Sequence, residues 1–414
     1  MKRKIVILNV MILAVALMIG AVGCKKKSET TTFSLTSLKA GAIDLNAAVP
    51  PTNVPANSAI TATFNLDVDA TTANTNTITL TQAYDTSLVT ITVTTNGAAI
   101  TITPSGNLGN GSQYTLVING VKSTDGQGLS MITKYFTTVG TFVPAGAVAY
   151  WNFEGNANDQ VGTLNGTPTN INYVSSFNAA AGQAADFDGT TSIIEVPGAD
   201  VLLNTNSFTL AFWVHAVSGL TDTSGNSKGQ FVMGLGAFHG FEYEIDGAYS
   251  TCKMAASYNV NDTATNTDLW FSADGNLGYV GWTFCRDLRD LGGLAALVKD
   301  QWANVVCRYN ADTKVGTMYI NGQKEKEQDF NLYAGSPLMR ASGMEWNSAQ
   351  TECEDILAFG FIKSKSSTLW NDTPWGAYDK PYANHFHGQL DEVRIWHKAL
   401  TENEIVSMYN SIKP

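Results

Sequence analysis

The chain has 414 residues, of which 15% are charged and 10% are aromatic, and its formal net charge is −11. This length is enough for two or three domains once an N-terminal segment is set aside. The acidic balance excludes a nucleic-acid-binding surface, because proteins that bind phosphate backbones carry basic stripes.

The N-terminus has the pattern of a targeting segment. Basic residues at positions 2–4 precede an apolar run over 5–19, and the sequence AVGC then ends at Cys24. Small residues before a cysteine resemble a bacterial lipobox, which implies a signal peptide over 1–23, a lipidated Cys24 and a polar tether over 24–37. The resemblance places the protein in the bacterial cell envelope, anchored by lipid to the outer membrane. The alternative is an uncleaved transmembrane anchor, for which the apolar run is barely long enough.

Residues 38–140 show the period-two alternation of β-strands, in which every second side chain points to one face. In ITATFNLDVD, for example, Ile60, Ala62 and Phe64 share a face. Several such runs separated by turn signals predict an antiparallel β-sandwich. Their order, with its closing DGQGL and YFTT passages, resembles bacterial Ig-like domains of the S-layer type. The resemblance implies a spacer or an interaction module without catalytic chemistry.

Residues 141–149 contain the glycine and proline of a linker. Motifs spread over 150–414, from YWNFEGNANDQVG to GQLDEVRIWHKALTENEI, resemble the laminin-G-like, concanavalin A-like jelly-roll domains of bacterial surface proteins. The resemblance implies a second all-β domain that closes with a short helix, so the fold class is all-β. Compared with a minimal domain of that family, the chain carries insertions near 246–300 and 328–385.

The closing helix is also indicated by local chemistry. Thr401 and Glu404 have the spacing of a capping box, in which each side chain satisfies a backbone N–H of the other's residue. Ile405 and Met408 then recur at helical spacing, which predicts an apolar stripe lying on the sandwich.

The adjacent carboxylates Asp391 and Glu392 raise the possibility of acid–base catalysis. In a regular strand they point to opposite faces, with Asp391 beside Val393 and Ile395 and Glu392 beside Arg394. Two carboxylates on opposite faces cannot flank one glycosidic bond. An unpaired Asp391 on an apolar face is costly, and it needs backbone donors or a metal ion.

The family resemblance supplies a metal for Asp391. In relatives of the jelly-roll fold, the loop after the first strand and the acid of the closing strand bind a structural Ca²⁺, which implies Glu154, Asn156 and Asp159 as ligands together with Asp391. Oxygen ligands of these types suit calcium. The alternative is that Asp391 caps loop amides and that the acidic loop is solvated.

Four cysteines remain if Cys24 is lipidated, and all lie in the C-terminal half: Cys252, Cys285, Cys307 and Cys353. An even number in an oxidising compartment predicts at least one disulfide, with three possible pairings. The alternatives are a zinc site, which no C-x-x-C spacing supports, and free buried thiols.

One strand suggests a glycoside hydrolase without completing its motif. FEYEIDGAY starts the E-x-D-x-x-E pattern with Glu244 and Asp246, but Tyr249 stands where the third acid belongs. Glu242, Glu244 and Asp246 share a face, so a shifted catalytic pair is conceivable. Hydrolase is the third and least favoured hypothesis.

The two insertions are rich in aromatic residues beside Gly, Asn and Asp, a combination that suits stacking on sugar rings and hydrogen bonding to their hydroxyls. The candidate ligand-binding residues are Trp270, Tyr279, Trp282, Trp346, Trp370, Trp375 and Tyr378. The alternative is that these side chains pack the insertions onto the sandwich, which is the commoner use of large aromatics.

Together these features predict a non-catalytic, lipid-anchored envelope protein that binds glycan through its second domain. The alternative partner is a surface protein, in an adhesion or envelope-assembly role, because fold does not fix function. The cofactor prediction is structural Ca²⁺, and no nucleic-acid partner is expected.

Overall fold

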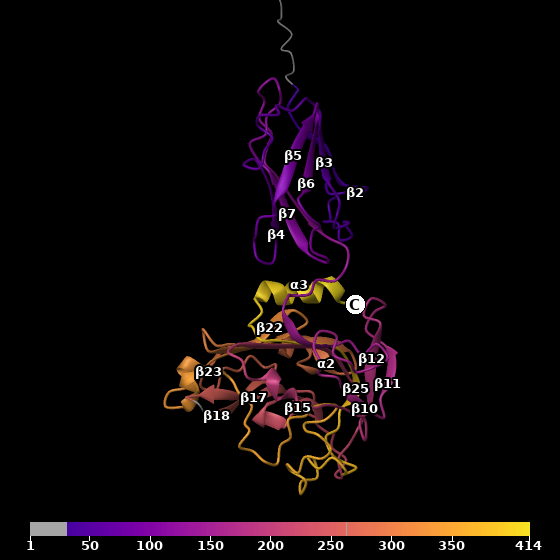
Figure 1. Ribbon diagram of the computed structural model, residues 1–414, viewed down its shortest axis with the longest axis vertical. Helices are drawn as coiled ribbons and strands as arrows, with labels where there is room; N and C mark the ends of the chain where they lie inside the picture. The colour runs from indigo at the N-terminus through magenta and orange to yellow at the C-terminus, as the bar shows by residue number, and fades with distance from the viewer. Residues whose placement is uncertain (1–30, 262) are drawn as a thin grey trace, which may run out of the picture.

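The computed structural model describes residues 31–261 and 263–414, with the backbone alone for Trp270. The predicted signal peptide and Cys24 lie outside this range. No helix among the described residues is long and apolar enough to span a bilayer. Two β-rich domains are stacked along the long axis of the molecule, with the helix α3 (Glu402–Ile412) between them (Figure 1). The all-β prediction is confirmed.

The N-terminal domain packs two antiparallel sheets against each other. In the described chain, one sheet has the strand order β2-β1-β3-β6-β5 and the other β4-β7-β8. Their bounds are β1 Leu35–Ala40, β2 Ile43–Asp44, β3 Ile60–Phe64, β4 Ile78–Gln82, β5 Ile91–Asn96, β6 Ala99–Pro104, β7 Gln113–Ile118 and β8 Ile132–Thr137. Ile60, Ala62 and Phe64 are buried in the shared core, as their alternation predicts.

The folded domain begins earlier than the sequence indicates. Strand β1 starts at Leu35, and Phe33 is buried with its ring centroid 5.1 Å from that of Phe64. The last residues of the predicted tether over 24–37 therefore belong to the folded domain. Similarly, the linker predicted over 141–149 ends in strand β9, which starts at Ala147.

The C-terminal domain is a sandwich of two larger sheets. The nine-stranded sheet runs β11-β12-β25-β14-β20-β21-β22-β19 with β9 on β25, and the eight-stranded sheet runs β10-β13-β24-β15-β16-β17-β18 with β23 on β17. The strand bounds are β9 Ala147–Trp151, β10 Thr167–Thr169, β11 Asn172–Ser175, β12 Gln183–Asp188, β13 Ile193–Val196, β14 Phe208–Ala216, β15 Gln230–Leu235, β16 Phe241–Ile245, β17 Cys252–Val260, β18 Ala264–Phe271, β19 Trp282–Cys285, β20 Trp302–Asn310, β21 Val315–Ile320, β22 Gln323–Asp329, β23 Ala341–Met344, β24 Leu357–Phe359 and β25 His387–Trp396. The helices are η1 Ala199–Leu202, η2 Ala237–His239, η3 Arg289–Leu291, α2 Ala295–Val298, η4 Phe330–Leu332, η5 Pro337–Arg340 and α3.

The two predicted insertions are largely parts of this sandwich. The range 246–300 contains β17 and β18, whose inward side chains fill the core between the sheets. The range 328–385 contains β24, which lies between β13 and β15 in the eight-stranded sheet. These strands are integral to the eight-stranded sheet, and the segments that connect them extend beyond it.

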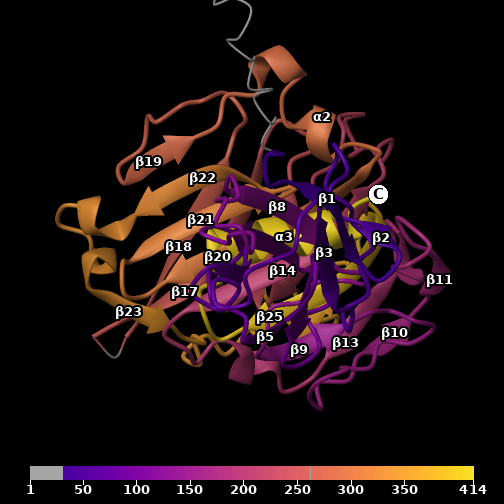
Figure 2. The same cartoon turned by 90° about the horizontal axis from the view of Figure 1, so that it is seen from above.

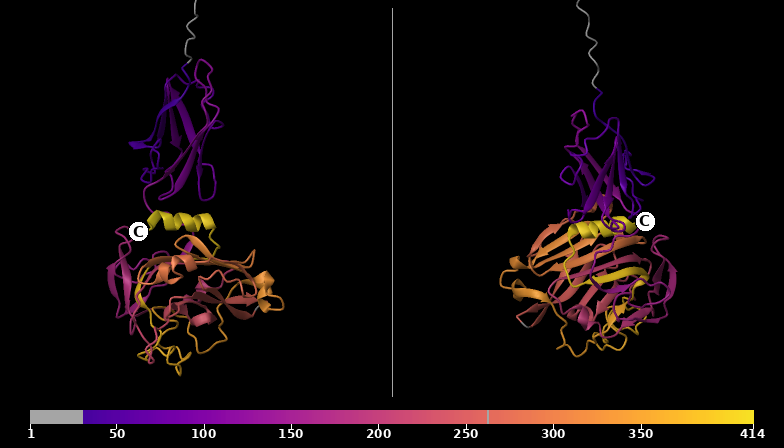
Figure 3. Two further views of the ribbon diagram at one scale, coloured as in Figure 1. Left: turned by 180° about the vertical axis from the view of Figure 1, so that it is seen from behind. Right: turned by 45° about the horizontal axis from the view of Figure 1, so that its top comes forward.

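Helix α3 follows the prediction closely. The Thr401 hydroxyl accepts from the backbone N–H of Glu404, and the Glu404 carboxylate accepts from that of Thr401, which completes the capping box. Ile405 and Met408 pack on Trp396 at the outer face of the nine-stranded sheet. Figure 3 shows the helix lying across that sheet and beneath the N-terminal domain.

A β-bulge at Glu392 breaks the alternation of strand β25. Glu392 has a φ of 54°, and the register against β14 shifts at this point. Leu390, Val393 and Ile395 all face the sandwich core, so Asp391 faces outward. The prediction that Asp391 shares a face with Val393 and Ile395 is wrong, because the extra residue turns the strand over between them.

Candidate ligand-binding site

A groove opens where the ends of the two sheets meet. Strand β18 ends the eight-stranded sheet, and β22 and β19 end the nine-stranded sheet. These strands lie at the same side of the sandwich, opposite β10 and β11 (Figure 2). The cavity, called the edge groove here, has a volume of about 840 Å³. It is lined by Thr251, Asn266, Thr267, Asp268, Ser272, Asp274, Asn276, Tyr279, Val280, Trp282, Gln328 and Tyr333.

The buried Gln328 side chain connects the two sheets at the groove. With its amide oriented to match its neighbours, the oxygen accepts from Trp282 Nε1 at 3.1 Å and from the Tyr333 hydroxyl. The amide nitrogen donates to the backbone oxygen of Asp268 in β18 at 3.2 Å. The side chain thus ties β22 to the edge strand of the opposite sheet and fixes the Trp282 indole.

Aromatic side chains form one wall of the groove. The Tyr279 ring is 66% exposed, and its centroid lies 4.8 Å from that of the largely buried Trp282. Gly281 between them has a φ of 81°, and a Cβ there would collide with the Tyr333 ring. Glycine is therefore required for the loop to lie against Tyr333 and to present Tyr279 to solvent.

Polar side chains line the same groove. Asp274 accepts from the Ser272 hydroxyl at 2.6 Å and from the backbone N–H of Asn276 at 3.0 Å. These hydrogen bonds, the one from Ser272 first, lower the pKa of Asp274, so it remains a carboxylate at neutral pH. Asp268 and Asn266 come from β18 and alternate along its exposed edge with Thr267.

A buried amine lies behind the aromatic wall. The Lys326 side chain is fully buried with its Nζ against the Trp282 ring, and it finds no hydrogen-bond acceptor within the described part of the chain. Burial lowers the pKa of Lys326 to about 6, and Cys285 and Asp274 only partly oppose this effect. Lys326 is therefore mostly neutral at pH 7 and adds little positive charge to the groove.

The structure brings part of the predicted aromatic set to this groove. Tyr279 and Trp282 line it, and Trp270 lies on the neighbouring strand β18. The sequence interpretation missed Asp268, Asp274, Gln328 and Tyr333 as lining residues. Both aspartates belong to the same polar and aromatic stretch as Tyr279, which was the available signal.

The remaining predicted aromatics pack a separate segment onto the eight-stranded sheet. Trp346 packs against the main core, and Trp370 lies 5.7 Å from the Phe238 ring. The Tyr378 hydroxyl donates to the backbone oxygen of Thr191 at 2.6 Å. None of these four side chains lines the edge groove, and Trp375 alone among them is exposed, at 40%.

The segment that holds these aromatics is organised by a buried lysine. Lys363 Nζ donates to the backbone oxygen of Ser367 at 2.9 Å, to Asn371 Oδ1 at 2.6 Å and to the backbone oxygen of Leu369. Three acceptors around one ammonium group fix the loop over 363–371 without regular secondary structure.

Two of the four predicted calcium ligands are already engaged within their loop. Asn156 Oδ1 accepts from the backbone N–H of Asn158 at 2.9 Å. The Asp159 carboxylate accepts three backbone N–H groups, from Tyr150 at 3.0 Å, Val161 at 3.1 Å and Leu164 at 3.2 Å. Asp159 therefore stabilises the loop through its amides.

The other two predicted ligands, Asp391 and Glu154, interact electrostatically. Asp391 accepts from the Ser176 hydroxyl at 2.5 Å and from the backbone N–H of Glu392 at 2.7 Å. Burial raises the pKa of Asp391 to about 8, and Glu154 adds to this effect. Glu154 itself accepts from the backbone N–H of Gln183 at 3.0 Å. No three His, Cys, Asp or Glu side chains of the described residues converge as metal ligands.

All four cysteines of the C-terminal half are free thiols. Cys252 and Cys307 are buried in the core, and Cys285 and Cys353 are partly buried. The Cys252 thiol lies 3.5 Å from the Met318 sulfur. The structure does not support the predicted disulfide, and the alternative of free thiols describes these residues.

The acids of the suspected hydrolase motif have partners of their own. Lys253 bridges Glu242 at 3.3 Å and Glu244 at 3.1 Å, and burial raises the pKa of Glu242 to about 8. The Glu242 side chain is only 2% exposed. Asp246 accepts from Ser250 and Thr251 and closes the following turn. Each of the three acids is therefore held by a partner within the fold.

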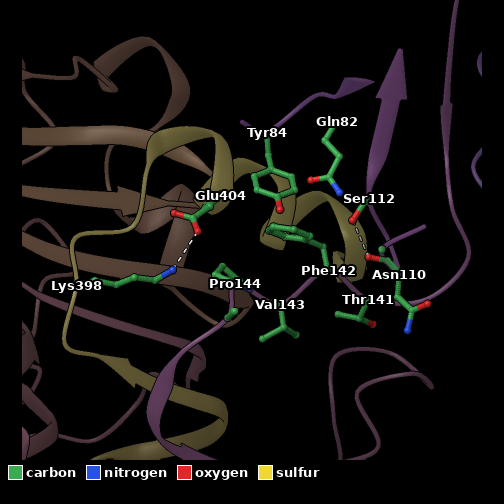
Figure 4. A pocket seen from close by; sticks show the side chains of 12 residues that line it. Gln82, Tyr84, Asn110, Ser112, Thr141, Phe142, Val143, Pro144, Lys398 and Glu404 are labelled. Carbon is green, nitrogen blue, oxygen red and sulfur yellow. Dashed lines mark hydrogen bonds and ion pairs between the residues drawn. The ribbon is translucent and has the colours of Figure 1, made fainter. Parts of the chain in front are cut away.

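A second cavity, of about 400 Å³, lies where the domains meet (Figure 4). The Tyr84 ring of the N-terminal domain lies 4.8 Å from Phe142 of the linker, whose backbone N–H donates to the Ser411 hydroxyl of α3. Lys398 and Glu404 form an ion pair across the cavity mouth at 3.1 Å. This cavity belongs to the contact that joins the two domains.

Comparison with known proteins assigns the first of these domains. Residues 42–139 match the family described as "Bacterial Ig-like domain". These residues form a bacterial Ig-like domain. The match confirms the predicted Ig-like fold of this domain, and no curated protein matches the chain.

Solved structures resemble the chain over a larger span but at low similarity. The botulinum neurotoxin type G receptor-binding domain is 11% identical with a TM-score of 0.38, covering 64% of this chain and 51% of that chain. The binding domain of Paraclostridial mosquitocidal protein 1 is 15% identical with a TM-score of 0.41, covering 64% and 52%. The chain thus spans about half the length of the solved chains it resembles.

Proposed function

We propose that this protein is a non-catalytic binding protein that holds a glycan in the edge groove. The observation that carries the proposal is that the Tyr279–Trp282 wall lines one cavity together with hydrogen-bonding side chains of β18 and of the loop that follows it. Sugar rings offer apolar faces for stacking and hydroxyls for hydrogen bonds, so such a groove matches both. Rigid aromatic side chains also lose little conformational entropy on binding.

The shape of the groove supports an extended ligand. Its lining includes Asn266, Thr267 and Asp268 of β18 and Ser272 just after that strand, and the six residue steps from Asn266 to Ser272 span at most roughly 20 Å. The groove is fixed by the Gln328 contacts between the sheets, so a ligand meets a surface that is already organised. These properties favour recognition of several consecutive units of a chain.

The Ig-like domain suits a spacer in this proposal. It lies between the first described residues and the C-terminal sandwich (Figure 1), so it would hold the groove away from an attachment at the N-terminus. We propose, from the lipobox pattern, that this attachment is a lipidated Cys24 at the bacterial outer membrane.

The test is binding of the purified protein to a polysaccharide panel in native gels, followed by calorimetry on each retained glycan. Replacing Tyr279 by Ala removes an exposed ring and should weaken binding about tenfold, the loss of about 1.4 kcal/mol. The matched control is Tyr135→Ala, which removes a ring 48% exposed on the Ig-like domain. Equal effects of the two variants would contradict the proposed site.

A protein partner is the second candidate, favoured by one specific observation. Leu277, Tyr279 and Val280 expose 53%, 66% and 63% of their surfaces on one short loop beside the groove. Strand β18 is also an open edge that an extended peptide could extend as a further strand. Failure of all glycans to bind would shift the proposal to this partner class.

A further inference from the structure

A thiol and an amine face each other across strands β19 and β22, behind the aromatic wall of the edge groove. Cys285 of β19 is directly opposite Lys326 of β22 in the antiparallel ladder. Directly opposed residues share a face of the sheet, with their Cβ atoms about 4.5–5.5 Å apart. The flexible four-carbon stem of lysine therefore allows the Lys326 amine to reach the Cys285 sulfur.

The Lys326 amine carries a lone pair that no hydrogen bond uses. Its side chain is fully buried, and Nζ has no hydrogen-bond partner among the described residues. Burial lowers the pKa of Lys326 to about 6, so the amine is mostly neutral at pH 7. A neutral amine is a nucleophile, whereas an ammonium group is not.

The Cys285 thiol is the more accessible partner. It is partly buried, whereas Cys252 and Cys307 are buried in the core. Its Sγ lies 4.0 Å from the backbone oxygen of Arg286, too far for a strong hydrogen bond. Burial raises the pKa of the Cys285 thiol, and Lys326 only partly opposes this effect. Because the thiolate is the reactive form, Cys285 should oxidise slowly at neutral pH and faster at alkaline pH.

We propose that Cys285 and Lys326 are a modification site, at which hydrogen peroxide links the sulfur of one to the nitrogen of the other. First, the Cys285 sulfur attacks a peroxide oxygen, the O–O bond breaks, and the released hydroxide takes the thiol proton as water, which leaves a sulfenic acid. The Lys326 lone pair then attacks this sulfur, the S–O bond breaks, and hydroxide leaves with one amine proton as water. One peroxide is reduced to two waters while the thiol and the amine become a sulfenamide.

The link would also relieve the fold of a costly group. A buried amine without a hydrogen-bond acceptor is unfavourable, and the nitrogen of a sulfenamide no longer takes up a proton near neutral pH. The link would tie β19, the last strand of the nine-stranded sheet, to its neighbour β22. This inference is independent of the proposed glycan binding.

The test treats the purified protein with hydrogen peroxide at mildly alkaline pH and maps its peptides by mass spectrometry. The Cys353→Ser variant is the parent protein, because it lacks the other partly buried thiol. We expect a linked pair of peptides that contain Cys285 and Lys326, with a mass about 2 Da below the sum of the two free peptides, and we expect dithiothreitol to separate them. Peroxide that only adds oxygen to Cys285, or leaves it a thiol, overturns the inference.

Two lysine variants of this parent assign the nitrogen. Lys326→Met should give no linked pair, and its Cys285 should instead gain oxygen as a sulfinic or sulfonic acid. Lys324→Met, on the same strand, is the matched control and should still form the link. A linked Cys285 peptide in the Lys326→Met variant would mean that another group is the partner, which also overturns the inference.

Discussion

The indole Nε1 of Trp282 donates to the side-chain oxygen of Gln328 at 3.1 Å, and this contact joins a groove wall to the strand behind it. Gln328 is 3% exposed, so both partners of the hydrogen bond are shielded from water. Removing one partner of such a bond leaves the other unsatisfied.

Replacing Gln328 by Ala should therefore lower stability and weaken ligand binding together. The expected loss in the free energy of unfolding is about 1–3 kcal/mol, because the Trp282 indole, the Tyr333 hydroxyl and the Asp268 carbonyl all lose a partner. Thermal unfolding and calorimetry with the bound glycan measure the two effects. Gln323→Ala, at an exposed position of the same strand, is the control. A stable Gln328→Ala variant with normal binding would show that the contact does not hold the groove.

Replacing Lys326 by Met should stabilise the protein, most strongly near neutral pH. The pKa of Lys326 is about 6 in the folded chain, against 10.5 as its ordinary value, so the unfolded chain binds one more proton between these values. The free energy of unfolding of the natural protein therefore rises with pH across this window and falls as pH drops toward 6. The variant lacks this dependence, and we expect a gain of about 1–3 kcal/mol at pH 7 that shrinks by pH 10.

Urea unfolding at several pH values measures this effect. Lys324→Met, on the same strand but partly exposed and paired with Glu327, provides the comparison. A gain of the same size at pH 7 and pH 10 would mean that Lys326 is not held in its neutral form.

Lys363→Met should loosen the segment that carries Trp370. The variant leaves the carbonyls of Ser367 and Leu369 without their donor, which costs about 1–3 kcal/mol where such groups are buried. Hydrogen exchange should rise over 363–371 and stay unchanged in the edge groove. Lys380→Met, at an exposed position, should change neither.

Calcium should have little effect on the protein. Asp159 and Asn156 are engaged with backbone groups, and the buried Asp391 has a hydroxyl partner. We expect the same unfolding temperature with added calcium and with a chelator. A rise of several degrees with calcium, lost in Asp391→Asn, would instead restore the ligand set implied by the family resemblance.

Regular local patterns allowed much of the fold to be predicted. Alternation at Ile60, Ala62 and Phe64 predicts a half-buried strand because a slip by one residue would expose the whole face. The capping box at Thr401 and Glu404 marks the start of α3 through short-range hydrogen bonds alone. Both signals depend on neighbours within a few residues.

The errors arise where distant segments decide the outcome. At the Glu392 bulge, β25 has one more residue than the facing part of β14. The residue types around Glu392 give no signal for this bulge. The groove depends on Gln328 meeting the edge of β18, about sixty residues earlier in the chain. The local composition made Tyr279 and Trp370 equally good candidates for ligand binding. The packing of the sandwich partly buries the Trp370 ring and leaves Tyr279 exposed, and composition does not predict that difference.

Strand β25 lies between β12 and β14 inside the nine-stranded sheet, and it also pairs with β9. These partners are made early in synthesis, whereas β25 and α3 follow them by roughly 180 residues or more, counted from β14 at Phe208–Ala216 to β25 at His387–Trp396. A ribosome can therefore release a finished Ig-like domain while the sandwich still lacks a central strand. A message truncated before the codons of β25 would yield a chain with a folded first domain and a second domain that exposes two unpaired strand edges, which is a substrate for proteases.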